Sequence, residues 1–351
     1  MNVKSILIVW VALAAPAFSQ GFAGMGQSAD GFALPTPEPH FTFPEDHGAH
    51  PDFRIEWWYL TANLKGEDGK DYGAQWTLFR NALAPEGGTG WSNPQIWMGH
   101  AGLTTPEAHF SAERFARGGI GTAGVTASPF EAFIGDWTMA GPDLNAITLT
   151  AQGTDFSYSL DARATQPFVR QGANGYSVKS PEGQASYYYS QPFYEVTGEI
   201  VLPSGPVAVT GTAWLDREWS SQPLSPDQTG WDWFALNLPG GEKLMAFRLR
   251  HDDGADFHSG TWITADGTPT PFASDDLVAT PLGWSETKGG RVPTRWRLEI
   301  PAYNLDIEVS ALNPQSWMDT SVAYWEGPVR FKGSHAGVGY LEMTGYDDPN
   351  P

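Results

Sequence analysis

The sequence predicts an all-β protein made of two related domains, and three observations carry this prediction. The chain of 351 residues contains 40 Gly and 28 Pro, a combined share well above the usual value of about 12%. Aromatic residues make up 13% of the chain, and aromatic side chains favour strands. Apolar and polar residues alternate along most of the chain, and one pattern occurs twice. Together these features are typical of many short strands joined by turns.

The N-terminal segment, residues 1–19, is predicted to be a signal peptide. An apolar run from Ile6 to Ala15 is followed by the small-residue cleavage site Ala17-Phe18-Ser19. Such a run is too short to cross a bilayer. Residues 20–40 are dense in Gly, Ser and Pro and are predicted to be a flexible tether. We expect a periplasmic or secreted protein whose mature chain, cleaved before Gln20, has no transmembrane helix; an uncleaved anchor is the alternative.

From about Phe41 onward the apolar pattern has mostly the period of a strand. One segment differs: Pro106–Arg117 is predicted to be a short helix, with Thr105 as its N-cap and Gly118-Gly119 at its end. A chain of strands with regular turn signals forms a sandwich or a barrel. The predicted strands are Tyr72–Leu83, Asp155–Leu160, Ser186–Tyr189, Val207–Trp214, Lys243–Arg250 and Trp296–Ile300.

An internal repeat divides the chain into two domains. Phe193-Tyr194-Glu195 is followed by a segment from Gly211 to Asp216, and Tyr324-Trp325-Glu326 is followed by a similar segment from Gly337 to Glu342. Both copies read aromatic, aromatic, Glu, and then Gly-x-small-aromatic-Leu-acid. The polar, proline-containing stretch 221–230 between the copies suits a domain boundary. We predict an N-terminal domain over residues 41–222 and a C-terminal domain over residues 223–351.

Composition and motifs exclude several classes of function. The formal charge of −20 repels phosphate backbones, so we expect no nucleic-acid partner. The chain has no Cys, which excludes disulfides, thiolate metal sites and a Cys nucleophile. It also lacks a Gly-x-Ser-x-Gly motif, a phosphate loop and a dinucleotide fingerprint. His47, His50 and Asp52 have the spacing of metal ligands but lie in a Pro/Gly-rich loop, so we predict neither a metal site nor a cofactor.

Two segments concentrate charges among tryptophans. On the first, strand alternation places His50, Asp52, Arg54, Glu56 and Trp58 on one face. The second runs from Trp214 to Gln222, and alternation separates its acids from its basic residue.

On this second segment, Trp214, Asp216 and Glu218 share a face, while Leu215, Arg217 and Trp219 point the other way. Charges beside tryptophan are desolvated and need partners, and Arg54 is a candidate partner for Asp216 or Glu218. The group is then either a structural ion pair that plugs one end of a barrel, or an acid with a raised pKa that serves as a general acid.

The segments HPDFRIEWWYLTANL, GAQWTLFRNAL, GYSVKS, YYYSQPF, WLDREWSSQPL, GWDWFALNL and YWEGPV together resemble the AttH-like family, which is related to the acyclic carotenoid hydratases. The resemblance runs from about residue 40 to residue 346. It implies a pair of tandem lipocalin-like (calycin) antiparallel barrels, a fold that commonly encloses a hydrophobic ligand. Members of this family are described as secreted predicted hydrolases or as companions of an ABC-type membrane permease. The resemblance therefore implies either a hydrolase activity or a membrane permease as partner.

The likeness to the carotenoid hydratases is more distant. Those enzymes carry His-Asp-His-Asn-Trp where this chain has Leu215-Asp216-Arg217-Glu218-Trp219, so only the Asp and the Trp correspond. The resemblance implies that a carboxylic acid protonates an alkene and that aromatic faces stabilise the resulting cation. The residues expected to act in catalysis are Asp216, Glu218, Glu56 and Arg54. Those expected to contact the ligand are His50, Trp57, Trp58, Tyr59, His100, Glu195, Arg217 and Trp219.

Three functions remain open from the sequence. The first is an exported protein that binds a hydrophobic, isoprenoid- or lipid-like small molecule. The second is an enzyme on the same cavity, a hydratase, isomerase or hydrolase. The third is a carbohydrate-binding β protein with exposed tryptophans, although tryptophans beside paired charges suit burial better.

Overall fold

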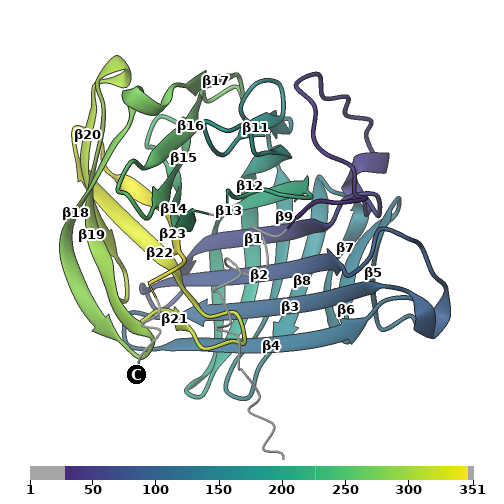
Figure 1. Cartoon of the computed structure of the whole chain (residues 1–351). Helices are drawn as coiled ribbons and strands as arrows, with labels where there is room; N and C mark the ends of the chain where they lie inside the picture. The colour runs from purple at the N-terminus through teal and green to yellow at the C-terminus, as the bar shows by residue number, and fades with distance from the viewer. Residues whose placement is uncertain (1–27, 226, 347–351) are drawn as a thin grey trace, which may run out of the picture.

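The structure of the protein is a computed structural model that describes residues 28–225 and 227–346. The predicted signal peptide and the first part of the predicted tether lie outside the described residues. The strands form two antiparallel sheets, each curled into a barrel or half-barrel (Figure 1). This confirms the predicted all-β class. Within the described ranges, no helix is long and apolar enough to cross a membrane.

The first sheet has 13 strands in the order β4-β3-β2-β1-β13-β12-β9-β8-β7-β6-β5, with β10 and β11 paired to β12. Apolar side chains from both halves of this curled sheet form one core. The strands are β1 (Ile55–Gly66), β2 (Asp71–Ala82), β3 (Gln95–Thr104), β4 (His109–Arg117), β5 (Ala123–Ala127), β6 (Phe130–Ile134), β7 (Trp137–Asp143), β8 (Ala146–Gln152), β9 (Ser157–Ala164), β10 (Val169–Arg170), β11 (Tyr176–Val178), β12 (Ala185–Leu202) and β13 (Gly205–Ser220).

The second sheet has ten strands in the order β17-β16-β15-β14-β23-β22-β20-β19-β18, with β21 paired to β22. Its strands are β14 (Gln228–Asn237), β15 (Lys243–His251), β16 (Phe257–Ile263), β17 (Pro269–Phe272), β18 (Val278–Thr287), β19 (Gly290–Ile300), β20 (Leu305–Ala311), β21 (Trp317–Met318), β22 (Tyr324–Gly333) and β23 (Gly337–Met343). Short 3₁₀ helices occur at Glu45–His47, Gly90–Ser92, Ser274–Asp276 and Pro301–Tyr303.

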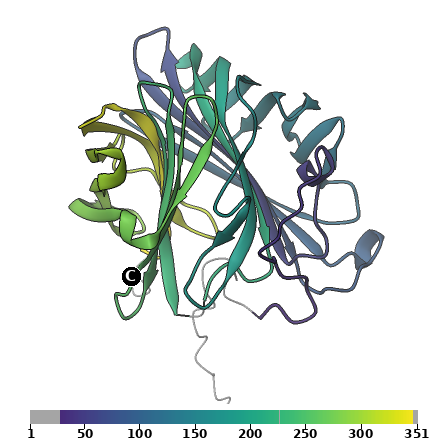
Figure 2. The same cartoon turned by 90° about the horizontal axis from the view of Figure 1, so that it is seen from above.

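The two sheets pack against each other through a third apolar cluster. Figure 2 shows the second sheet (green to yellow) beside the first (purple to teal). The cluster draws buried side chains from both sheets, among them Tyr59 and Trp214 of the first and Trp233 and Phe247 of the second. Burying side chains of this size removes a large apolar area from water. The two sheets therefore share a continuous apolar interface.

The predicted helix at Pro106–Arg117 is wrong, because most of this segment is the edge strand β4. It pairs with β3 in a hairpin, from Thr104 opposite His109 to Ile96 opposite Arg117. Thr105 caps the turn between β3 and β4 and not a helix. Its Oγ1 accepts hydrogen bonds from the backbone amides of Glu107 and Ala108, and its own amide donates to Ala108 O at 2.8 Å. A Thr can cap a β-turn as well as a helix, and pairing with β3 decides between the two.

The internal repeat corresponds to equivalent positions in the two sheets. β1 lies beside the β12–β13 hairpin just as β14 lies beside the β22–β23 hairpin. Tyr59 on β1 pairs with Asp216 on β13, and Trp233 on β14 pairs with Glu342 on β23. The match between Asp216 and Glu342 in the sequence is therefore a match in space.

The sequence repeat also aligns Glu195 with Glu326, but these two acids do not occupy equivalent positions in the sheets. Glu326 pairs with Glu342, whereas the residue opposite Asp216 is Ser190. A register shift in β12 between Gln191 and Tyr194 displaces the sequence pattern, and Glu195 is exposed.

Replacing Gly211 by Ala is expected to lower the free energy of unfolding by about 1–3 kcal/mol, the usual cost of forcing extra atoms into a packed site. A Cβ at this position would lie 2.0 Å from Asn63 O on β1, and at the equivalent Gly337 it would lie 2.3 Å from Asn237 O. Both glycines let two strands approach closely. The measurement is the urea midpoint, with Gly87→Ala as the control, because a Cβ there meets no atom within 4 Å. Equal midpoints for the two variants would contradict this reading.

Candidate functional site

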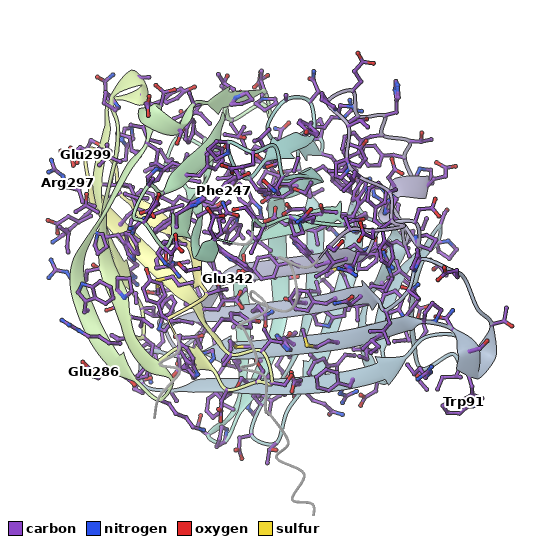
Figure 3. All side chains as sticks on the ribbon, viewed as in Figure 1. Trp91, Phe247, Glu286, Arg297, Glu299 and Glu342 are labelled. Carbon is purple, nitrogen blue, oxygen red and sulfur yellow. The ribbon has the colours of Figure 1, made fainter. Side chains whose placement is uncertain are left out.

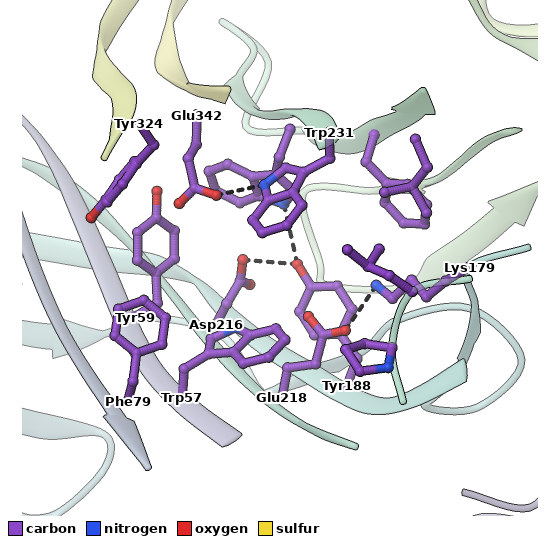
Figure 4. Close-up of a pocket in the computed structure, with 15 residues that line it drawn as sticks. Trp57, Tyr59, Phe79, Lys179, Tyr188, Asp216, Glu218, Trp231, Tyr324 and Glu342 are labelled. Atoms are coloured by element: carbon purple, nitrogen blue, oxygen red, sulfur yellow. Dashed lines mark hydrogen bonds and ion pairs between the residues drawn. The ribbon is translucent and has the colours of Figure 1, made fainter. Parts of the chain in front are cut away.

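The candidate site is a pocket between the two sheets, with about 770 Å³ of space not filled by protein atoms, including the solvent at its mouth. Aromatic side chains dominate its wall, and carboxyl groups enter from both sheets (Figure 4). The first sheet and its loops contribute Trp57, Tyr59, Phe79, Lys179, Tyr188, Asp216, Glu218, Pro223 and Leu224. The second contributes Trp231, Trp233, Phe247, Leu249, Tyr324 and Glu342. Phe247 and Glu342 lie inside the molecule, whereas Arg297 and Glu299 lie on the outer side of the second sheet (Figure 3).

Strand alternation explains which predicted residues reach this pocket. Trp57 and Tyr59 point into it from β1, and Asp216 and Glu218 do so from β13. The side chains between them point into the core of the first sheet, as a period of two requires. The predicted division of the β13 segment into two faces is thus seen in the structure.

Asp216 is a fully buried carboxyl held by three donors. Its Oδ1 accepts from Ser190 Oγ and from Trp214 Nε1, each at 2.6 Å. Its Oδ2 accepts from Tyr188 OH at 2.8 Å. Burial outweighs these hydrogen bonds and raises the pKa of Asp216 to about 7. A carboxyl with this pKa holds a substantial fraction of its proton near neutrality.

Glu342 occupies the equivalent place on the second sheet. Its Oε1 accepts from Trp231 Nε1 at 2.6 Å (Figure 4). Burial raises the pKa of Glu342 to about 7, with a smaller contribution from the nearby Asp216. Behind it, Glu326 accepts a hydrogen bond from Tyr59 OH. Burial and the neighbouring Glu342 raise the pKa of Glu326 well above its ordinary value.

The third acid of the pocket wall, Glu218, is held as an ion pair. Its Oε1 lies 2.8 Å from Lys179 Nζ and also accepts from Ser186 Oγ. The Lys179 ammonium lies 4.4 Å from the ring centroid of Phe247 on the second sheet. Lys179 and Glu218 therefore form a polar contact against an otherwise aromatic wall.

Glu56 lies in a separate buried ion cluster inside the first sheet. Its carboxylate accepts from Arg80 Nε, from Arg217 Nη2 at 2.6 Å and from the His50 side chain at 3.0 Å. Burial opposes ionisation, but Arg80 and Arg217 outweigh it and hold the pKa of Glu56 well below its ordinary value. A buried structural ion pair is thus present, but it joins Glu56 to Arg80 and Arg217 and not Arg54 to Asp216 or Glu218.

Aromatic rings cover the cations of this cluster. The Arg217 guanidinium lies 3.7 Å from the centroid of the Trp58 ring. His50 stacks on Trp219 with centroids 3.9 Å apart. The structure therefore places Glu56, His50, Trp58, Arg217 and Trp219 together, and none of them lines the pocket.

The predicted partner of Asp216 or Glu218, Arg54, contacts neither acid. Its guanidinium lies 5.1 Å from the Phe32 ring centroid, because β1 begins only at Ile55 and the preceding turn directs Arg54 away from the pocket. Expected ligand contacts also differ in place. His100 is buried on β3 beside Tyr324, and Glu195 is exposed on β12.

The possible metal ligands of the N-terminal loop do not converge. His47 Nδ1 lies 2.7 Å from Tyr189 OH, while His50 faces Asp46 and Glu56. Among the described residues, no three metal-binding side chains form a group.

Sequence reasoning missed residues of the pocket wall on both sheets. Among those it did not identify are Lys179, Tyr188, Trp231, Trp233, Phe247 and Glu342. The repeat contained the signal for three of them. Aligning Asn63 with Asn237 makes Trp57 equivalent to Trp231 and Tyr59 equivalent to Trp233 in the repeat. The pairing of β1 with β13 and of β14 with β23 shows the same equivalence.

The raised pKa of Asp216 predicts a pH-dependent difference in stability between the protein and Asp216→Asn. Between the ordinary pKa and about 7, the folded state holds a proton that the unfolded state has lost, so stability falls as pH rises. The variant lacks this loss. We expect the free energy of unfolding of Asp216→Asn to rise by about 2–3 kcal/mol relative to that of the wild type as the pH goes from about 5 to about 8.

Urea unfolding of both proteins across this range measures the difference. Burial lowers the pKa values of His47 and His109 to about 4, so these residues make stability rise with pH. Both proteins contain them, and the comparison of wild type with Asp216→Asn cancels their contribution. Asp306→Asn on the exposed face of β20 is the control, since the pKa of Asp306 is lowered by Arg297. Parallel stability curves for wild type and Asp216→Asn would show that Asp216 is ionised throughout.

Comparison with known proteins places this fold in a family. A model of the AttH-like family matches residues 34–346. The crystal structure of a protein described as an AttH from Nitrosomonas europaea has 33% sequence identity and a TM-score of 0.81, covering 90% of this chain and 100% of that chain. Kievitone hydratase from Nectria haematococca has the same fold, with 15% identity and a TM-score of 0.69 over 87% of this chain and 92% of that chain. No curated protein matches the chain. The chain therefore belongs to the AttH-like family.

Proposed function

We propose that the protein binds a hydrophobic, isoprenoid- or lipid-like small molecule in the pocket between the two sheets and adds water across an alkene of that molecule. The observation that carries the proposal is Asp216, a buried carboxyl in the wall of an aromatic pocket, where burial raises its pKa to about 7. A pocket of this kind suits an apolar ligand oriented by a few polar groups. The likeness of the fold to kievitone hydratase supports the same class of reaction.

The chemistry follows from the placement of these groups. Asp216 gives its proton to one alkene carbon, so that a C–H bond forms as the carboxyl O–H bond breaks, and the other carbon becomes a carbocation. The indole faces of Trp57 and Trp231 stabilise this cation by about 2 kcal/mol or more when water is excluded. A water molecule then forms the C–O bond and gives up one proton to a carboxylate of the pocket.

Asp216 is suited to this role because its two oxygens differ. Oδ1 is occupied by two donors from the protein, whereas Oδ2 meets only Tyr188 OH. Tyr188 OH also accepts from Trp233 Nε1 at 3.3 Å. The proton is therefore expected on Oδ2, with the carboxyl held in one orientation by donors of β12 and β13.

Quenching of tryptophan fluorescence by farnesol, a C15 isoprenoid alcohol, tests the binding step. We expect saturable one-to-one binding that Leu224→Trp weakens by about ten-fold or more, because the larger side chain fills a pocket that Leu224 lines. The control is Leu282→Trp on the exposed face of β18, which is expected to bind as the wild type does. Quenching by cellohexaose instead of farnesol would favour the carbohydrate-binding alternative.

We further propose that the protein acts in the periplasm or outside the cell, on the evidence of the signal sequence before Gln20. Intact-mass spectrometry of the protein recovered from that compartment is expected to give a chain that begins at Gln20, as glutamine or as pyroglutamate. A chain that retains Met1 would contradict it.

A further inference from the structure

A line of polar side chains leads from the pocket to the partly exposed Glu113 on β4. It begins at Glu342, which faces Tyr59 in the pocket (Figure 4). Burial raises the pKa of Glu342, and the interaction with the Tyr59 hydroxyl opposes this rise. Tyr59 OH donates to Glu326 Oε1. Tyr324 interacts with the same carboxyl, whose Oε2 is buried and has no hydrogen-bond partner among the described residues. Three titratable groups of β22 and β23 are thus joined through a hydroxyl of β1.

The line continues through the first sheet. Tyr324 OH lies 3.0 Å from His100 Nδ1, and His100 Nε2 lies 3.0 Å from Glu113 Oε1 on β4. His100 is fully buried, whereas the Glu113 side chain is 20% exposed and also accepts from Ser321. The line therefore ends at solvent.

The hydrogen bonds have a consistent direction. Burial opposes ionisation of Glu113, but hydrogen bonds from His100 and Ser321 lower its pKa, so Glu113 is a carboxylate and accepts from His100 Nε2–H. His100 Nδ1 then accepts from Tyr324 OH. From Tyr324 to Glu113 each link is thus a hydrogen bond directed towards solvent, and Tyr59 OH directs its own hydrogen bond towards Glu326.

We propose that Glu342, Tyr59, Glu326, Tyr324, His100 and Glu113 form a proton path that carries the proton released by the adding water from the pocket to solvent. At each link one proton enters as one leaves, so that every group returns to its starting state after reorientation. Asp216 regains its own proton from solvent when the ligand leaves the pocket, and the reaction releases no net proton. The use of the path in turnover rests on the proposed function.

The groups around Glu326 favour passing a proton on over keeping a negative charge on its carboxylate. Glu326 faces Tyr59, Tyr324 and Glu342, and the more distant Tyr158 and Tyr340 interact with it electrostatically. No Lys or Arg is among these groups, so an ionised Glu326 has no cation partner there. An apolar ligand in the pocket blocks the route through the pocket mouth, and the path through His100 stays available.

The test follows the proton of Glu326, which does not line the pocket. The infrared C=O band of its protonated carboxyl, assigned by its loss in Glu326→Gln, shifts when the proton exchanges for deuterium after mixing with D₂O. All proteins carry Leu224→Trp to close the pocket side, so no ligand is needed. His100→Gln is expected to slow this exchange about ten-fold or more, because an amide can keep the hydrogen bonds but cannot relay a proton.

The matched control is His109→Gln on the neighbouring strand β4, a buried histidine that contacts Thr104 and Met318 rather than the path. It is expected to exchange as the parent does. If His100→Gln fails to fold, Tyr324→Phe removes one link and keeps the ring. Exchange at the parent rate in a folded His100→Gln or Tyr324→Phe would overturn the path. Because no substrate enters the experiment, this result is independent of whether farnesol binds.

Discussion

Asp216→Asn is expected to lower the rate of hydration by about 10²–10⁴-fold while leaving ligand affinity nearly unchanged. The amide has the shape of the carboxyl and can keep the contacts with Ser190 and Tyr188, but it has no acidic proton to give to an alkene. The loss should therefore appear in kcat rather than in binding.

The measurement uses D₂O, in which each hydration adds one deuterium to carbon, detected by mass spectrometry. Farnesol, kievitone and lycopene form the first panel of alkenes, with Asp306→Asn as a surface control for the same substitution. Full turnover in a folded Asp216→Asn would exclude Asp216 as the acid. Farnesol binding by a wild type that hydrates none of the three would favour a carrier that delivers its ligand, for example to a membrane permease.

Arg217→Met is expected to lower the free energy of unfolding by about 3–5 kcal/mol, the largest effect on stability that the structure predicts. The change leaves Glu56 buried with one of its two arginine partners gone, and an incompletely compensated buried charge is costly. It also exposes the faces of Trp58 and Trp219 that the guanidinium covers. Urea midpoints measure the loss.

The control is Arg297→Met on the outer surface of the second sheet (Figure 3). There Arg297 pairs with Asp306. An exposed pair contributes about 1 kcal/mol or less. The loss in Arg217→Met should also shrink as pH falls towards 4, because Glu56 with only one arginine partner takes up a proton at a higher pH in the variant than in the wild type. Similar losses in the two variants would show that the ion cluster does not hold the first barrel together.

The face assignments of the site were predictable from the sequence, since they need only the period of a strand. Alternation along β13 separates Asp216 and Glu218 from Arg217 without knowledge of any other strand. The partner of Glu56 was not predictable in the same way. Glu56 lies opposite Arg80 on β2, and that pairing depends on the register between two strands, which the charge pattern of one strand does not contain.

The pocket itself was partly encoded in the internal repeat. The position of Glu342 follows from that of Asp216, because Gly211 and Gly337 anchor the same strand pairing in both sheets. Glu195 was carried along by the same alignment and is exposed, because the register shift in β12 lies just before it. A bulge leaves little trace in the sequence. The prediction of a helix at Pro106–Arg117 was wrong for a related reason. Pairing with a neighbouring strand overrides local capping signals, and this pairing is not visible in the segment itself.

Organic extraction and mass spectrometry of the protein purified from its own host test the central claim most directly, namely that the pocket between the sheets holds an apolar ligand. The account predicts one isoprenoid- or lipid-like molecule per chain in the wild type and little or none in Leu224→Trp purified in parallel. A wild type that carries no such molecule and does not take up farnesol, or an equal amount in both proteins, would contradict it.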